Sequence, residues 1–338
     1  MRTIWTSTTG LLLLWAALAP TPAAALGPEQ LALIVNTADP YSVEIGAYYA
    51  RRRGIPPANV IFVTLPVGRD EISRQEFETA KAEVDARLPA TVQALAVAWT
   101  TPFRVDCLSI TTAFAFGFDP AFCAQGCLPT RRSPYFNSPS RAPFSDLTLR
   151  PAMLLAGQSL AAGKALIDRG VAADATFPDG TAYLLSTTDR ARNKRAAGYA
   201  QVEAMQSRVR VERLEANDLR DRRDVLFYFT GLPTVAGLET LRFRPGAVAD
   251  HLTSAGGWLT GHGQMSALRW LDAGATASYG TVQEPCNFTT KFPEPAVVIA
   301  RYTRGETLLE AYWKSVAMPG QGVFVGEPLA APFRAQTR

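Results

Sequence analysis

Short apolar runs recur along the chain, and stretches with a helical spacing of apolar side chains separate them. A short apolar run bounded by turn residues is typical of a buried strand. We expect such strands at residues 31–36, 59–65, 94–99, 181–187, 225–230, 275–280 and 322–325. The intervening stretches predict helices at residues 42–53, 71–88, 158–169, 193–205, 264–272 and 307–316.

This alternation indicates the fold class, because strands that alternate with helices build parallel sheets through right-handed crossovers. The first helix has the expected end signals: Ser42 is placed to cap its start, and Gly54 is placed to end it before two prolines. The sequence therefore predicts an α/β fold with a mostly parallel sheet covered by helices on both faces.

Residues 100–151 break the alternation, since proline, glycine, serine and phenylalanine are dense there. We interpret this segment as a loop-rich, cysteine-containing insertion within a single α/β domain that spans residues 26–338.

The amino terminus has the pattern of a secretory signal peptide. Arg2 supplies a positive charge, residues 11–19 form a short apolar segment, and Ala23 and Ala25 provide small residues before a cleavage point. We expect residues 1–25 to be removed on export, and the mature protein to be periplasmic or extracellular. No later segment is apolar over the length that a membrane span needs, so no transmembrane segment is expected after cleavage.

Export changes how the four cysteines are interpreted, because an even number outside the cytoplasm favours disulfides over free thiols. Cys123 and Cys127 are close in sequence, with Gly126 easing a tight loop between them, so we expect them to form a disulfide. Cys286 would then have Cys107 as its partner. The two histidines lie far downstream, so no metal site is expected.

The net charge of +4 from 34 basic and 30 acidic residues is too small and too dispersed to predict nucleic-acid binding. Residues 208–224 carry charges of both signs and are interpreted as a solvated, salt-bridged face on a helix or its flanks. A basic cluster at a strand-to-helix junction could instead hold an anion; it comprises Arg190, Arg192, Lys194 and Arg195.

The chain has no phosphate-binding GxxxxGK[ST], no zinc-binding HExxH and no GxSxG nucleophile motif, and no cofactor is expected. What remains is His262 between two glycines and Cys286 further on. Each follows an apolar block, and this order resembles caspase-like cysteine peptidases. A cysteine hydrolase that uses His262 and Cys286 is therefore one candidate function.

Several segments across the chain resemble an uncharacterised family of secreted bacterial proteins found in genomes that carry the exosortase protein-sorting system. The family implies export and no known activity. The segments comprise Tyr41-Ser-Val-Glu, Tyr48-Tyr49, Arg53-Gly-Ile-Pro56, Asp168-Arg-Gly170, Pro245-Gly-Ala, His251-Leu-Thr-Ser254, Ala273-Gly-Ala, Gly280-Thr-Val-Gln-Glu-Pro-Cys286, Gly305-Glu-Thr-Leu, Glu310-Ala-Tyr-Trp-Lys-Ser315 and Gly326-Glu-Pro-Leu329.

This family in turn is distantly similar to gingipain-type peptidases, through Gly274-Ala-Thr-Ala277 and Gly326-Glu-Pro328. That resemblance implies a three-layer peptidase-like fold. The catalytic histidine of such peptidases would fall at Thr230-Gly231-Leu232, and the nucleophilic cysteine near His251-Leu-Thr-Ser254. Neither residue type stands at the matching place, so the resemblance implies a scaffold without those catalytic groups.

Three interpretations follow. The first is a non-catalytic exported protein that binds a protein or a glycan where the carboxyl ends of the strands meet. The second is the cysteine hydrolase with His262 and Cys286, and the third is a different hydrolase built around His251 with Ser254 and Asp250. In the first, we expect one cleft floored by Trp99; its other residues would be Asn36, Asp189, Thr230, His251, Ser254 and Glu284.

Overall fold

The computed structural model describes residues 25–205 and 208–335, and its centre is a ten-stranded sheet. The proposed signal peptide lies outside the described residues, except for Ala25. In spatial order the strands are β2 (Val60–Val63), β1 (Leu31–Asn36), β4 (Ala94–Val97), β7 (Ala152–Leu154), β13 (Gly322–Gly326), β12 (Ala277–Thr281), β11 (Phe243–His251), β10 (Val225–Thr230), β8 (Thr181–Ser186) and β9 (Arg210–Glu215).

Most neighbouring strands pair in parallel. β2, β1, β4 and β7 are parallel to one another. β12, β11, β10, β8 and β9 are likewise parallel to one another. β13 stands between the two groups: it pairs antiparallel with β12 over five residues and meets β7 at one residue pair, Val325 with Leu154. The expected mostly parallel sheet is confirmed.

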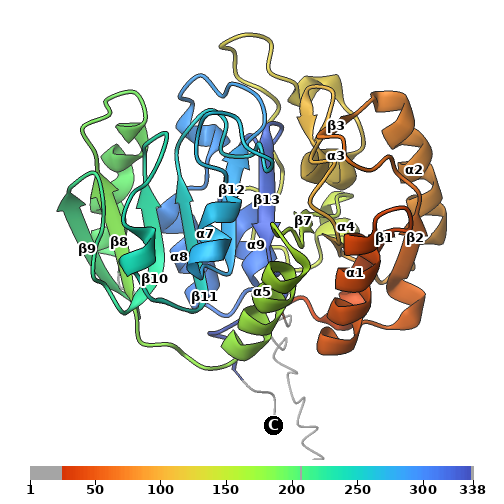
Figure 1. Ribbon diagram of the computed structural model, residues 1–338, viewed down its shortest axis with the longest axis horizontal. Helices are drawn as coiled ribbons and strands as arrows, with labels where there is room; N and C mark the ends of the chain where they lie inside the picture. Colours follow the sequence, from red (N-terminus) through yellow and green to blue (C-terminus); the bar gives the residue numbers. More distant parts are fainter. Residues whose placement is uncertain (1–24, 206–207, 336–338) are drawn as a thin grey trace, which may run out of the picture.

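Helices cover both faces of this sheet, so the three-layer arrangement is also confirmed. In Figure 1, α5 and α7 lie in front of the strands, and α8 and α9 lie behind them. The helices are α1 (Pro40–Arg53), α2 (Arg74–Arg87), α3 (Ile110–Phe116), α4 (Pro143–Leu147), α5 (Leu160–Ala173), α6 (Tyr199–Ala204), α7 (Leu268–Ala273), α8 (Pro295–Thr303) and α9 (Leu308–Trp313). Short 3₁₀ helices are η1 (Pro28–Gln30), η2 (Pro57–Asn59), η3 (Pro120–Phe122), η4 (Asn193–Gly198), η5 (Leu238–Thr240) and η6 (Thr289–Lys291).

The helix ends follow ordinary capping chemistry, with one correction. Asp39, not Ser42, caps α1, because its carboxylate accepts the backbone N–H of Tyr41. The Ser42 hydroxyl lies inside the helix and accepts the backbone N–H of Asn36. Gly54 ends α1 in the left-handed conformation, as expected.

Residues 100–151 contain more regular structure than the composition suggests. Beside α3 and α4, the segment holds β5 (Arg104–Val105) and β6 (Leu108–Ser109), which join β3 (Glu71–Ile72) in a small second sheet. The fully buried Ile110, Ala113 and Phe114 of α3 belong to the hydrophobic core. The segment is therefore packed against the domain along α3.

Some elements were not expected from the sequence. Residues 210–215 form the edge strand β9, so the charged stretch is a strand rather than a helix face. Its side chains are half-buried to exposed, and opposite charges on an edge strand deter pairing with another chain. β7, α8 and most of β11 were also missed, and Pro245 within β11 hid that strand.

No helix within residues 25–205 or 208–335 is long and apolar enough to cross a membrane.

Candidate functional site

The loops that follow β8, β11 and β12 meet the short strand β5, which follows β4 in the chain, around an open cleft of about 520 Å³. Its lining includes Arg104, Arg192, Ser254, Trp258, His262 and Glu284. The loop after β2 joins the same edge, because the Thr260 hydroxyl donates to Asp70 at 2.9 Å. Strands from both halves of the sheet thus contribute to one site.

Trp258 forms the centre of a stack on the wall of this cleft. The His262 ring lies nearly parallel to the indole, with centroids 4.4 Å apart and an angle of 20° between the planes. The Arg104 guanidinium carbon lies 5.2 Å from the Trp258 ring, within the range of a cation–π contact. His262 is exposed, and Gly261 and Gly263 on either side adopt positive φ, which presents the ring at the tip of the loop.

Arg192 is held in place by groups from two loops. Its Nη1 lies 2.8 Å from the Asp189 carboxylate, and its Nε donates to the Thr253 hydroxyl. Burial opposes ionisation of Asp189, but hydrogen bonds from Arg192 outweigh it and lower the Asp189 pKa. Asp189 therefore positions Arg192, and only Arg192 lines the cleft.

Gln264 joins the two ends of the loop after β11. Its side-chain oxygen accepts the Thr253 hydroxyl at 2.6 Å and the backbone N–H of Ala255 at 2.8 Å. Glu284 has a similar role in the next loop, where its carboxylate accepts the backbone N–H of Cys286. Both side chains line the cleft, so it is bordered by loops fixed by their own hydrogen bonds.

Of the residues predicted to bind a ligand, Ser254 and Glu284 line the cleft, whereas four others, among them His251, are interior. Asn36 is fully buried and bonds both backbone groups of Leu65 through its side-chain amide. Trp99 is fully buried in the core, where its Nε1 donates to the Pro102 carbonyl. Thr230 is 1% exposed, and its carbonyl accepts a bond from Arg195.

His251 is also buried, and both of its ring nitrogens are occupied. Nδ1 accepts the Trp270 indole N–H at 2.9 Å, which leaves Nε2 to donate to the Met265 carbonyl at 3.1 Å. Burial lowers the His251 pKa to about 3. This neutral, fully bonded imidazole has no free nitrogen to accept a proton from Ser254.

Asp250 has different partners. Its carboxylate pairs with Arg195 at 2.5 Å and accepts the Tyr312 hydroxyl at 2.8 Å. Burial and this carboxylate act in opposite directions on Arg195; the carboxylate prevails and raises the Arg195 pKa, so the guanidinium stays charged. The Asp250 carboxylate is thus bound by Arg195 and Tyr312. The prediction of a hydrolase built on His251, Ser254 and Asp250 is therefore wrong.

The disulfide pairing differs from the expected one. The bonds are Cys107–Cys123 and Cys127–Cys286, so the expected Cys123–Cys127 bond and its partner Cys107–Cys286 are wrong. Proximity in sequence misled here, because α3 and the turn η3 bring Cys123 back to Cys107. Cys286 has no free thiol, which removes the hydrolase based on His262 and Cys286.

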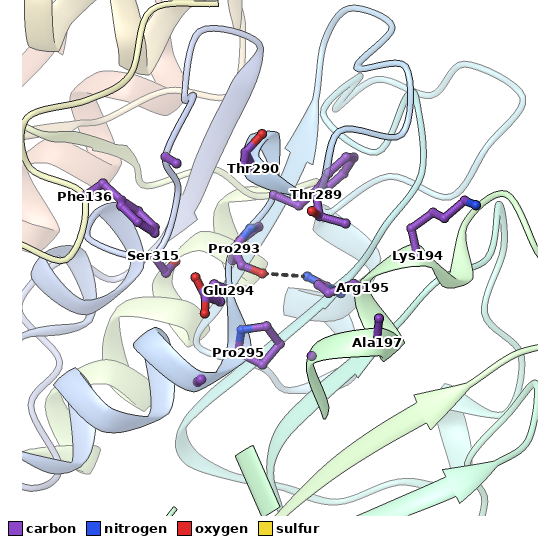
Figure 2. Close-up of a pocket in the computed structure, with 14 residues that line it drawn as sticks. Phe136, Lys194, Arg195, Ala197, Thr289, Thr290, Pro293, Glu294, Pro295 and Ser315 are labelled. Carbon is purple, nitrogen blue, oxygen red and sulfur yellow. Dashed lines mark hydrogen bonds between the residues drawn. The ribbon is translucent and has the colours of Figure 1, made fainter. Parts of the chain in front are cut away.

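The basic cluster 190–195 does not gather around one anion. Arg192 faces the cleft, while Arg195 is an interior ion pair. A second pocket of about 230 Å³ lies between η4 and the start of α8, and Lys194 is on its rim (Figure 2). There Arg195 donates to the Pro293 carbonyl at 3.2 Å, which Figure 2 shows across the pocket.

Among residues 25–205 and 208–335, no three histidine, cysteine or acidic side chains cluster as metal ligands would.

Sequence reasoning missed Trp258, Arg104 and Gln264 as cleft residues. One signal was present: Trp258 and His262 stand four apart in a glycine-rich stretch, where an aromatic side chain has no helix or strand to pack into. Arg104 gave no such signal, because only the folded insertion brings it to Trp258.

Comparisons with known proteins add little to this geometry. No protein-family model matches the chain, and no curated protein matches it either. One solved structure, a protease, aligns with 91% of this chain and 79% of its own, at a TM-score of 0.47 and 10% sequence identity. A likeness this low carries no functional inference.

Proposed function

We propose that this is an exported, non-catalytic protein that binds a polar ligand, presented by another protein or a glycan, in the cleft around Trp258. The observation that supports the proposal most is the set of polar side chains that three separate loops and the short strand β5 direct to one cleft. Ligand sites in α/β sheets collect where loops leave the carboxyl ends of strands.

The absence of catalysis in this proposal rests on the state of the candidate groups. Hydrolysis by a side-chain nucleophile needs a nucleophile within hydrogen-bond reach of a base. Cys286 is bonded to Cys127, and His251 is bonded at both nitrogens. The gingipain resemblance assigns catalysis to Thr230 and to the 251–254 segment. These positions lie side by side, because Thr230 pairs with His251 in the sheet, but the first holds no histidine and the second no cysteine.

The chemistry of the lining indicates what the ligand offers. Arg104 and Arg192 present guanidinium groups, and each is already partnered by a carboxylate, from Glu71 and Asp189 respectively. Pairing leaves N–H groups free for hydroxyl or carboxylate oxygens while keeping the local charge low. Glu284 accepts hydrogen bonds at the opposite loop. Such a lining suits a hydroxyl- or carboxylate-bearing chain.

Export is part of the proposal. It rests on the signal-peptide pattern of residues 1–25 and on the two disulfides, which are typical of oxidising compartments. The resemblance to secreted proteins of exosortase-carrying bacteria suggests a ligand on the cell surface or on sorted proteins.

Binding is tested by isothermal titration calorimetry of the purified protein against panels of oligosaccharides and peptides, because this readout does not depend on Trp258. We expect a ligand whose affinity falls at least tenfold in Trp258→Leu and Arg192→Lys. The control is Arg190→Lys, because Arg190 is exposed and does not line the cleft.

Equal affinity in the control and both cleft variants would contradict the site. Hydrolysis of any bound peptide or ester by the wild-type protein, lost in Ser254→Ala, would contradict the non-catalytic function.

A further inference from the structure

The first described residues, Ala25 and Leu26, are buried and held by hydrogen bonds. Ala25 is 7% exposed and Leu26 is 1% exposed. The Leu26 backbone N–H donates to Glu310 Oε2 at 3.2 Å, and the Leu26 carbonyl accepts from Arg334 at 2.6 Å. This segment is therefore fixed at both its N–H and its carbonyl.

Glu310 is a fully buried carboxylate with no cation at ion-pair distance among the residues that the structure describes. Its Oε2 accepts three hydrogen bonds: from the Thr307 backbone at 2.9 Å, from the Thr307 hydroxyl at 2.8 Å and from Leu26. Its Oε1 is buried and has no hydrogen-bond partner in the described chain. Burial raises the Glu310 pKa, and the bonds from Thr307 offset this only in part.

The neighbouring cations are committed elsewhere. Lys314 is fully buried and lies 2.9 Å from Glu306, and Arg301 lies 3.4 Å from the same carboxylate. Within residues 25–205 and 208–335, no lysine, arginine or histidine lies at ion-pair distance from Glu310. In the described chain, one of two adjacent buried acids thus has two cations at ion-pair distance and the other has none, although the charge of Lys314 also acts on Glu310 from further away. A buried charge without a partner is costly.

We propose that cleavage of the Ala25–Leu26 peptide bond creates an α-ammonium group on Leu26 that forms a buried ion pair with Glu310. In this hydrolysis, water adds OH to the Ala25 carbonyl carbon, the C–N bond breaks, and the Leu26 nitrogen takes the other proton of the water. The new Ala25 carboxyl group then releases its proton, and the Leu26 amine takes it to become the ammonium. The peptidase required is one that recognises small residues, here Ala23 and Ala25.

The geometry of the Glu310 carboxylate fits an ammonium better than an amide. A backbone amide has one N–H, which already reaches Oε2, whereas an ammonium has three. A second N–H can point to the unpartnered Oε1, and the added positive charge supplies what Glu310 lacks. Cleavage thus changes the Leu26 nitrogen from a neutral hydrogen-bond donor to a positively charged partner of the Glu310 carboxylate.

The burial of Ala25 sets the order of events. A scissile bond beside a 7%-exposed residue is out of reach of a peptidase in the folded protein, so cleavage precedes folding. The buried ion pair then forms only in a correctly processed chain. The final fold is in this way coupled to removal of the leader.

The experiment starts from the full chain secreted with its own leader, with the mature terminus determined by mass spectrometry. We expect Leu26 as the first residue. The thermal midpoint is then measured from pH 7 to pH 10.5 for the wild type, Glu310→Gln and the control Glu29→Gln, since Glu29 is exposed three residues from Leu26.

The pH dependence has a defined sign. A free α-amine has an ordinary pKa of about 7.7–8.0, and an ion pair raises it in the folded state. Its stabilisation is therefore present below about pH 8 and is lost as the pH rises through the raised value. Other charged or titratable groups close to Glu310 are Glu306, Lys314, Arg334 and Tyr135, and all four remain in every variant. The thermal midpoints of the wild type and of Glu29→Gln should therefore fall as the Leu26 amine loses its proton. The thermal midpoint of Glu310→Gln should lack this decrease.

A second measurement covers a Glu310→Gln variant that does not fold. The Leu26 amine of the native wild type should react with an acylating reagent at pH 8 at least tenfold more slowly than in urea. Its acylation rate in the native protein should increase as the pH rises. A mature terminus other than Leu26, or equal labelling rates in the native and unfolded states, would overturn the proposal.

Discussion

Asp250 and His251 are adjacent at the end of β11, yet their side chains serve opposite faces of the sheet. Asp250 pairs with Arg195 and accepts a bond from Tyr312 of α9, whereas His251 bonds Trp270 of α7. Successive strand residues alternate between faces, so two titratable neighbours in sequence are separated by the sheet itself. This alternation is why the two cannot act as a catalytic pair.

The Asp250–Arg195 pair leads to a first prediction. Both side chains are at most 4% exposed, so removal of one leaves a buried charge alone. We expect Arg195→Met to lower the free energy of unfolding by about 3–5 kcal/mol in urea titrations. The double variant Arg195→Met with Asp250→Leu should recover most of that loss, and Arg213→Ala, in an exposed pair, should change little. An Arg195→Met protein as stable as the wild type would disprove the structural role.

The neutral His251 leads to a pH prediction. Its pKa is lowered by burial to about 3, below the ordinary value of about 6.5, so the unfolded chain binds a proton there before the folded one does. Stability from this site is present above about pH 6.5 and is lost as the pH falls, by about 1.4 kcal/mol per pH unit. Glutamine does not titrate, so His251→Gln lacks this pH-dependent contribution. The variant should be less stable than the wild type at pH 7, and the difference in free energy of unfolding should narrow towards pH 4.5. A gap that stays constant in urea titrations would show that His251 is protonated in the fold.

The sequence predicted the sheet because buried parallel strands read as continuous apolar runs, as in residues 31–36 and 225–230. It failed where local chemistry and tertiary environment disagree. β9 is a strand of six residues with four charged side chains; it pairs with β8, and its Val211 and Leu214 pack against the core. No local pattern distinguishes it from a solvated helix.

The sequence led us to expect a cleft at the carboxyl ends of the strands, but most of the residues expected to line it do not. The principle that loops gather at the carboxyl ends of strands led to Glu284, and the resemblance to gingipain-type peptidases led to Ser254; both line the cleft. The same principle also led to Asn36, at the end of β1, and to Trp99, just after β4, but both side chains turn inward and bond backbone groups. Whether a strand-end polar group faces a ligand or its own loop depends on packing that one sequence does not contain.

The Cys127–Cys286 bond leads to a third prediction. It joins residues 159 apart, while Cys107–Cys123 joins residues 16 apart. The chain-entropy model gives about 5 kcal/mol for the longer closure and about 3 kcal/mol for the shorter. Replacing Cys127 and Cys286 by serine should therefore cost more stability in guanidinium titrations than replacing Cys107 and Cys123. It should also weaken ligand binding, since Glu284 is two residues from Cys286 and lines the cleft.

A non-reducing peptide map establishes the pairing before these variants are compared. Detection of a Cys123–Cys127 peptide would refute the structural pairing directly. Equal losses in the two double variants would show that enthalpic terms, not loop closure, dominate.

The last prediction concerns the contact between two backbones that shapes the cleft loop. A Cβ at Gly280 in β12 would lie 2.1 Å from the Gly256 carbonyl carbon and 2.2 Å from the Gly257 nitrogen. Backbone atoms cannot move aside as a side chain can, so Gly280→Ala must push the loop after β11 away from the sheet. We expect a loss of about 1–3 kcal/mol in urea titrations, with altered Trp258 fluorescence because Trp258 follows Gly257 directly. Gly198→Ala is the matched control: Gly198 has φ −89°, and a Cβ there meets nothing within 4 Å, so its stability should stay within about 0.5 kcal/mol of the wild type or rise slightly. If Gly280→Ala keeps wild-type stability and fluorescence, the loop is not held against β12, and the cleft cannot be preformed as described.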